Sequence, residues 1–116
     1  HAIQAGAYNI IQPSVAKVGG VSTVKEVFSM GRAAGLRVVP HSFYWGPGYV
    51  ATAHLIAAQP EPVWLETAFI EYAENPHDLI DPFDPNMTLS ADRPGLGFNA
   101  DGALFDRYLI SRSVIS

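Results

Sequence analysis

Polar side chains stand at the ends of three β-prone segments, where they could act in one reaction. Ser14 follows the first segment, His41 follows the second, and Glu66 ends the third. An imidazole takes up and returns protons near neutral pH, and a carboxyl group can act as an acid or as its partner. A hydroxyl can orient an imidazole, but it adds no negative charge that would raise its basicity. These residue types indicate acid–base chemistry centred on His41.

The segments that position these side chains have the pattern of strands alternating with helices. Three short, mostly apolar and β-prone runs are expected to form strands, at residues 8–12, 36–40 and 63–66. Between them, helical periodicity begins at a capping box of Thr23 and Glu26 and ends near Gly35, and a second helix is expected over residues 49–58. The β-α-β-α-β order predicts an α/β fold with parallel strands covered on both faces.

The two ends of the sequence differ from this rhythm. Residues 1–6 resemble the last turn of a helix closed by Gly6, which predicts that the sequence is a fragment beginning inside an element. After the third predicted strand the sequence is rich in Asp, Pro and Asn. A final short helix is expected to start near residues 99–101, with Leu104 and Tyr108 on one face.

Composition excludes several classes of function. The 116 residues are 48 % hydrophobic and 16 % charged, enough to bury a core, and the net charge of −4 gives no electrostatic basis for binding nucleic acid or an anionic membrane. No apolar run approaches the roughly 20 residues that span a bilayer. The absence of Cys excludes a disulfide framework, a thiolate zinc site and a thiol nucleophile, and it is compatible with a cytoplasmic protein.

Five stretches, in order, resemble the mandelate racemase and muconate lactonizing branch of the enolase superfamily. They are Ile11–Gly20, Val39–Ser42, Ala53–Ala58, Trp64–Glu66 and Arg93–Gly97. The resemblance implies the C-terminal part of a (β/α)7β TIM-like barrel. In that case residues 1–67 supply the last three strands and two helices, and residues 68–116 form a C-terminal segment that returns to the capping domain.

The resemblance also implies a reaction. The family abstracts a proton from the carbon next to a carboxylate, and Mg²⁺ stabilises the enediolate that results. His41 matches the family's histidine base, and Glu66 matches a protonated acid that donates a hydrogen bond to the substrate carboxylate. Ser14 departs from the pattern, because this position usually carries the Asp that orients the histidine. The alternatives are a structural, hydrogen-bonded histidine for His41 and an ordinary ion pair for Glu66.

Further residues are candidates for substrate contact. Ser14 and Tyr44 are expected to bind substrate, although the aromatics around Tyr44 could equally cover the barrel mouth. Lys17 could bind a carboxylate, but a structural role is favoured. His54, within the second helix, is expected to be packed or to cap. None of these residues has metal-ligand spacing, and the resemblance places the Mg²⁺ ligands and a lysine base upstream.

Three classes of function follow as hypotheses. The first is a lyase, a sugar-acid dehydratase, with a racemase or cycloisomerase as the alternative within the same family. The second is a non-catalytic relative that serves as a scaffold, and the third is an independent open-sheet domain. On the first hypothesis the substrate is a small carboxylate or sugar acid, the enzyme is a homo-oligomer, neither nucleic acid nor membrane is a partner, and the fragment alone is inactive.

Overall fold

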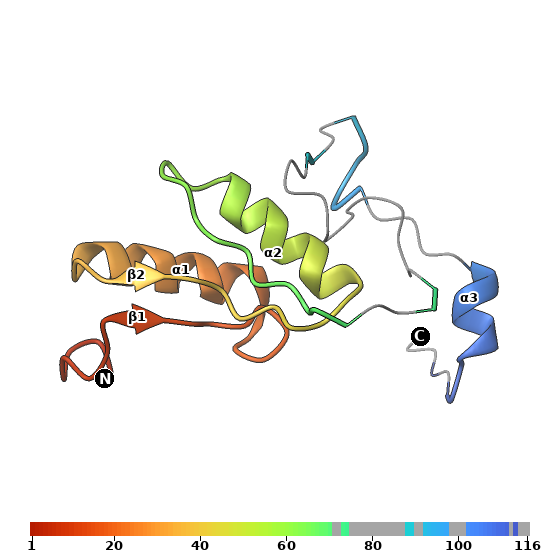
Figure 1. Ribbon diagram of the computed structural model, residues 1–116, viewed down its shortest axis with the longest axis horizontal. Coiled ribbons are helices and arrows are strands. Elements are labelled where there is room, and N and C mark those ends of the chain that lie inside the picture. The colour runs from red at the N-terminus through yellow and green to blue at the C-terminus, as the bar shows by residue number, and fades with distance from the viewer. Residues whose placement is uncertain (71–72, 75–87, 90–91, 98–101, 112, 114–116) are drawn as a thin grey trace.

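The computed structural model describes residues 1–70, 73–74, 88–89, 92–97, 102–111 and 113. Within them the chain forms two strands and three helices, in the order β1 (Ile10–Ile11), α1 (Gly20–Ala33), β2 (Arg37–Val38), α2 (Pro47–Ala57) and α3 (Gly102–Arg107). After α2 the chain turns back and runs in the same direction as β1 and β2 (Figure 1). None of the helices in these residues is both long enough and apolar enough to cross a membrane.

β1 and β2 form a parallel pair, as the β-α-β order predicts. The aligned residues are Ile10 with Arg37 and Ile11 with Val38. The pairing continues beyond the strands, because the Val39 N–H donates to the Ile11 carbonyl at 2.9 Å and the His41 N–H donates to the Pro13 carbonyl at 3.0 Å. His41 is therefore fixed beside the carboxyl end of β1.

Both strands are shorter than the predicted runs at 8–12 and 36–40. A proline follows each strand closely, at Pro13 and Pro40, and has no N–H to donate to a neighbouring strand. Pro13 cannot return a bond to the chain after β2, so the regular ladder ends before it although Val39 and His41 still donate to the chain after β1. Pro40 lies between these two donors and cannot donate on the opposite side, toward the third segment.

The third predicted strand is not part of the sheet. These residues have the two-residue alternation of a strand, because Val63 and Leu65 pack into the core whereas Trp64 is exposed. Their link to the chain after β2 runs through side chains instead of a ladder. The Ser42 N–H donates to the Glu66 carboxylate at 2.8 Å, and the Ser42 hydroxyl donates to the Glu66 carbonyl at 2.5 Å. Side-chain bonds occupy backbone groups that strand pairing would use.

The predicted start of the first helix is wrong. α1 begins at Gly20, after Gly19 with φ of 102°, and the Thr23 hydroxyl donates to the Gly19 carbonyl at 3.3 Å from within the first turn. A left-handed residue is easiest for glycine. The capping box of Thr23 and Glu26 is therefore absent, because the glycine pair starts the helix three residues earlier.

The end of α1 lies where the sequence predicts it. Gly35 has φ of 68°, its N–H donates to the Arg32 carbonyl at 3.1 Å, and the Leu36 N–H donates to the Gly31 carbonyl at 2.9 Å. This pair of bonds is a Schellman motif. It turns the chain directly into β2.

α2 begins two residues before the prediction, at Pro47, because proline suits the first helical position. It ends at Ala57, three residues before Pro60, close to the predicted end. Most of its residues are buried between α1 and the third segment.

The core lies between the two long helices and one face of the strands. Its buried members are Val15, Val24, Phe28, Val38, Ala51 and Leu55, with a second cluster of Tyr49, Val50 and Ala53. α1 meets β2 at Gly31, where a Cβ atom would stand 2.5 Å from Cγ2 of Val38. A side chain at this position would therefore push the helix off the strand.

The predictions for the chain ends hold in part. Residues 2–6 form turns rather than a regular helix, although the Ala5 N–H donates to the His1 carbonyl at 2.9 Å and Gly6 has φ of 62°. Leu104 of α3 is buried, whereas Tyr108, the residue after α3, is 65 % exposed. The Tyr108 N–H donates to the Leu104 carbonyl at 3.3 Å, which keeps the two residues one turn apart as predicted. The Tyr108 hydroxyl donates to a carboxylate earlier in the chain.

Candidate active site

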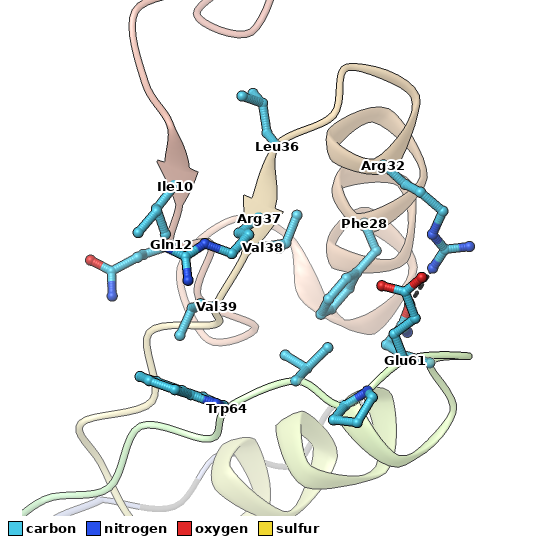
Figure 2. A pocket seen from close by; sticks show the side chains of 13 residues that line it. Ile10, Gln12, Phe28, Arg32, Leu36, Arg37, Val38, Val39, Glu61 and Trp64 are labelled. Carbon is cyan, nitrogen blue, oxygen red and sulfur yellow. Dashed lines mark hydrogen bonds between the residues drawn. The ribbon is translucent and has the colours of Figure 1, made fainter.

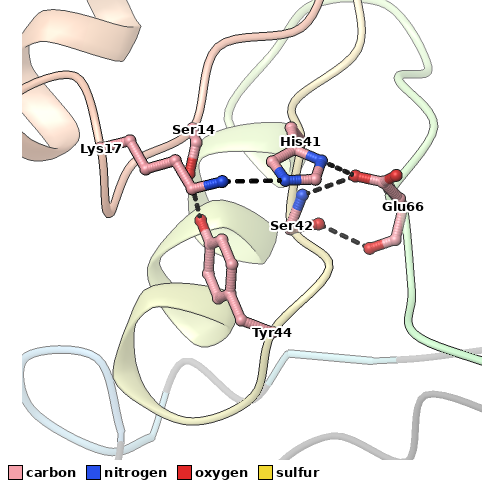
Figure 3. Close-up of polar contacts among 6 residues, drawn as sticks. All are labelled: Ser14, Lys17, His41, Ser42, Tyr44 and Glu66. Atoms are coloured by element: carbon pink, nitrogen blue, oxygen red, sulfur yellow. Dashed lines mark hydrogen bonds and ion pairs between the residues drawn. The ribbon is translucent and has the colours of Figure 1, made fainter. Parts of the chain in front are cut away.

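Four residues from three segments form a connected polar chain beyond the carboxyl ends of β1 and β2 (Figure 3). His41 Nδ1 lies 2.7 Å from Glu66 Oε2, and Lys17 Nζ lies 3.3 Å from His41 Nε2. The Ser42 N–H donates to the same oxygen of Glu66. The predicted pair of His41 and Glu66 is thus brought into direct contact, and both side chains remain about one-third exposed.

The alternation of the extended backbone explains why these side chains meet. Along the chain from β2, Val38, Pro40 and Ser42 are buried on the helix side, whereas Val39 and His41 are only partly buried. Residues two apart point to the same face of an extended chain. In residues 63–66 the same alternation directs Val63 and Leu65 to the core and Glu66 to the other face. His41 and Glu66 therefore meet on the face opposite the helices.

The contacts assign the protons of His41. An ammonium group has donors only, so Lys17 must donate to the lone pair of His41 Nε2. The ring proton is then on Nδ1 and is donated to Glu66 Oε2, which also accepts the Ser42 N–H. This geometry fits a neutral imidazole beside an ionised Glu66. It differs from the protonated, hydrogen-bond-donating Glu66 that the family resemblance implies.

Ser42 holds Glu66 in place. It is fully buried and bonds both the side chain and the main chain of Glu66. The buried hydroxyl finds its partner in the Glu66 main-chain carbonyl, and the Ser42 N–H donates to the carboxylate, so the two contacts together fix where the carboxylate stands. Sequence reasoning missed this role, although the buried–exposed alternation from Val38 onward would have placed Ser42 on the core side.

Ser14 and Tyr44, the two predicted substrate-binding residues, contact each other. Ser14 is 3 % exposed, and its hydroxyl donates to the hydroxyl of Tyr44 at 3.2 Å. The Tyr44 ring meets the His41 ring edge-on, with centroids 6.5 Å apart. Ser14 therefore supports Tyr44, and Tyr44 lies beside His41. The contact of either residue with substrate stays a prediction.

The other aromatics of this loop face elsewhere. Trp45 stacks on Tyr49 with centroids 6.0 Å apart, and Phe43 packs against Phe69. Burial raises the pKa of Tyr49 to about 12, because the phenolate would lose its hydration. Of the three loop aromatics, Tyr44 is the one that reaches His41.

Lys17 and His54 turn out differently. The sequence favoured a structural role for Lys17, but its ammonium reaches the imidazole of His41. His54 matches its prediction, because its Nε2 is 3.0 Å from the Leu96 carbonyl and links α2 to the C-terminal part. Only tertiary structure could separate the two, since neither sequence neighbourhood specifies a partner.

The described residues contain no group of three or more His, Asp or Glu side chains that could hold a metal ion. His41 Nδ1 and Glu66 Oε2 contact each other, so these two atoms are already occupied. These residues therefore do not fit an Mg²⁺ site on their own.

A groove of about 590 Å³ runs alongside the strands, between β2, α1 and the chain that follows α2 (Figure 2). Its lining includes Leu36 and Arg37 at the start of β2, Arg32 of α1, and Trp64. Neither His41 nor Glu66 lines it. Functional groups of parallel α/β folds collect at the carboxyl ends of the strands, so the polar chain, and not this groove, is the candidate site.

Comparison with known proteins places this arrangement in a family. The profile of the family described as enolase C-terminal domain-like matches residues 1–104. The chain belongs to the enolase C-terminal domain-like family. This confirms the resemblance seen in the sequence. Members of the enolase superfamily generally use Mg²⁺.

Two curated relatives of this enolase C-terminal domain-like chain are enzymes by name. The chain is 28 % identical over 109 residues to an arabinonate dehydratase of Saccharolobus solfataricus, and the match covers 88 % of this chain and 28 % of the relative. It is 37 % identical over 65 residues to a D-galactarolactone cycloisomerase of Agrobacterium fabrum, covering 53 % of this chain and 17 % of that protein. The chain thus spans less than a third of either relative.

Solved structures agree on the fold. A proposed racemase from Roseobacter denitrificans matches 91 % of this enolase C-terminal domain-like chain, and 31 % of its own, with a TM-score of 0.71 and 26 % identity. A proposed mandelate racemase from Bordetella bronchiseptica RB50 matches 90 % of this chain, and 27 % of its own, with a TM-score of 0.70. At 24 % identity the second shows the fold alone.

Proposed function

We propose that His41 is the acid–base residue of an active site that removes the proton next to a substrate carboxylate, and that the reaction is dehydration of a sugar acid. The observation that carries the proposal is the pairing of His41 Nδ1 with the Glu66 carboxylate at 2.7 Å. It leaves Nε2 as the basic nitrogen, in a side chain that is one-third exposed.

Glu66 supplies the negative charge that the hydroxyl of Ser14 lacks. When Nε2 takes a proton, the imidazole becomes a cation, and a carboxylate bonded to Nδ1 stabilises it. Ser42 keeps that carboxylate in position at 2.8 Å. A His–Glu pair thus takes the place of the His–Asp pair that the family resemblance leads one to expect.

Dehydration uses this pair as a proton donor and acceptor. Nε2 of His41 takes the proton from Cα and becomes imidazolium, while the electron pair of the Cα–H bond forms the C=C bond of an enol as the C–O bond to the β-hydroxyl breaks. The imidazolium returns that proton to the departing hydroxide so that water leaves, and the enol tautomerises to a 2-keto acid. The arabinonate dehydratase, which matches 88 % of the chain, supports this reaction.

We further propose that the Mg²⁺ ligands and a lysine base lie in parts of the enzyme outside this chain. The short share of each relative that the chain spans supports this division. The second candidate reaction is cycloisomerisation. It is supported by the 37 % identity to the D-galactarolactone cycloisomerase, which extends over 53 % of the chain.

The test is turnover by the complete protein, with Mg²⁺, of a panel of sugar acids in D₂O. We expect a 2-keto acid product from at least one of them, and loss of that product in His41→Asn. His54→Asn is the matched control, because His54 lies away from this pair and bonds Leu96. The proposal fails if no 2-keto product and no deuterium incorporation at Cα appear, or if His41→Asn is fully active.

A further inference from the structure

Lys17 contacts the side of His41 that Glu66 leaves open. Its ammonium stands 3.3 Å from Nε2, the nitrogen to which the proposed function gives the proton exchange. The reaction steps above make no use of this cation. An ammonium beside the reacting nitrogen must nevertheless affect what can approach it.

The backbone of Lys17 is held in place while its side chain is exposed. Both the Lys17 N–H and the Val18 N–H donate to the Ser14 carbonyl at 3.0 Å. The neighbours Ser14 and Val15 are buried, at 3 % and 8 % exposure. The turn therefore fixes the starting point of the side chain beside the site and leaves the ammonium able to change partners.

A substrate group that exchanges a proton with Nε2 has to take the direction that Lys17 now occupies, because the nitrogen has one lone pair. The ammonium then loses its acceptor but remains near the reacting atom. Its best new partner is a negatively charged oxygen, since charge-assisted hydrogen bonds are about twice as strong as neutral ones. A cation or an uncharged group in the same place would leave it less satisfied.

We propose that Lys17 is a specificity-determining residue that binds an anionic oxygen of the substrate beside the atom that exchanges its proton with His41 Nε2. The inference rests on the proposed role of His41. In the free site Lys17 covers the lone pair of Nε2. An anionic substrate draws the ammonium away and uncovers that lone pair.

Binding of glycolate and its uncharged analogue glycolamide to the complete protein tests this, followed through the NMR signals of the His41 ring. Lys17→Met is expected to weaken glycolate binding about fivefold, the size expected of an exposed ion pair, and to leave glycolamide binding unchanged. Lys17→Arg, which keeps the charge, is expected to retain most of the preference. Lys25→Met is the matched control, because Lys25 is an exposed lysine of α1.

Equal binding of glycolate by the wild type and Lys17→Met overturns the inference. It is also overturned if Lys25→Met weakens glycolate binding as much as Lys17→Met does, because the effect would then come from the net charge of the protein and not from the position of Lys17. With an active sugar acid, Lys17→Met should raise KM more than it lowers kcat. The binding assay needs no turnover, so the two proposals can fail separately. If His41→Asn stays active while glycolate binding depends on Lys17, the proposed function falls and the anion-binding role stands.

Discussion

The two ring nitrogens of His41 have different neighbours, and that difference sets its chemistry. Nδ1 faces a carboxylate at 2.7 Å, and Nε2 faces an ammonium at 3.3 Å. Nδ1 can donate its proton to the carboxylate, whereas the ammonium donates to the lone pair of Nε2. A substrate anion that draws Lys17 away would free that lone pair and leave the contact with Glu66 in place.

Replacing the carboxylate of Glu66 by an amide tests this balance at the scale of one residue. Glu66→Gln keeps the size of the side chain but removes the charge that stabilises imidazolium, so we expect kcat of the complete protein to fall by about 10²–10⁴-fold. Steady-state kinetics with the sugar acid that is turned over measures the loss. Glu61→Gln is the control, because Glu61 lies at an exposed position on the groove, and its kcat should equal that of the wild type. Equal kcat values for Glu66→Gln and Glu61→Gln would contradict the role of Glu66.

At the scale of elements, the close approach of α1 to β2 sets the position of the site. His41 follows β2 by three residues, and β2 is covered by α1 at Gly31. Ser42 then fastens the third segment to the same stretch of chain. The distance between His41 and Glu66 therefore depends on how these backbones pack.

Adding one methyl group at Gly31 tests that packing. A Cβ there would stand 2.5 Å from Val38 Cγ2, so Gly31→Ala should lower the free energy of unfolding by about 1–3 kcal/mol, the usual cost of overpacking a core. Urea denaturation measures it. Gly102→Ala in α3 is the control, because a Cβ there has no neighbour within 4 Å in the described part of the chain. Equal stability of the two variants would show that α1 can shift freely.

At the scale of the whole molecule, large apolar side chains stand uncovered on the face of the strands opposite the helices. Trp64 is 78 % exposed and Ile10 is 41 % exposed, and Phe69 nearby in sequence is 83 % exposed. A protein rarely leaves many such residues open to water without a partner surface. The chain spans 31 % of a solved relative and 28 % of a curated one. We expect this face to be covered in the complete protein.

Fluorescence can test that coverage, because the chain has two tryptophans. In the isolated chain Trp45→Phe leaves only Trp64, and we expect acrylamide to quench its emission strongly. In the complete protein the difference in emission between Trp45→Phe and the double variant Trp45→Phe/Trp64→Phe reports Trp64, and we expect it to be quenched weakly. In Trp64→Phe the remaining Trp45, already packed on Tyr49, should change much less. Equal quenching of Trp64 in both forms would mean that this face stays open.

The sequence by itself determined the order of β1, α1, β2 and α2, the parallel pairing of β1 and β2, and the end of α1 just before Gly35. It also singled out His41 and Glu66, whose role in a reaction stays a prediction. These features depend on signals within a few residues, such as glycine at a helix end or a proline after a strand. The early start of α1 was missed because a left-handed Gly19 outweighed the local capping pattern.

Only the tertiary structure decided which residues of the site contact each other. Lys17 meets His41, and Ser42 meets Glu66, across 24 residues of sequence in each case. Ser14 turned to Tyr44, 30 residues away, instead of to the imidazole. No local pattern specifies such partners, because they depend on how α1 and α2 set the packing of three separate backbones. The contacts of His41 with Glu66 and with Lys17 follow from that packing.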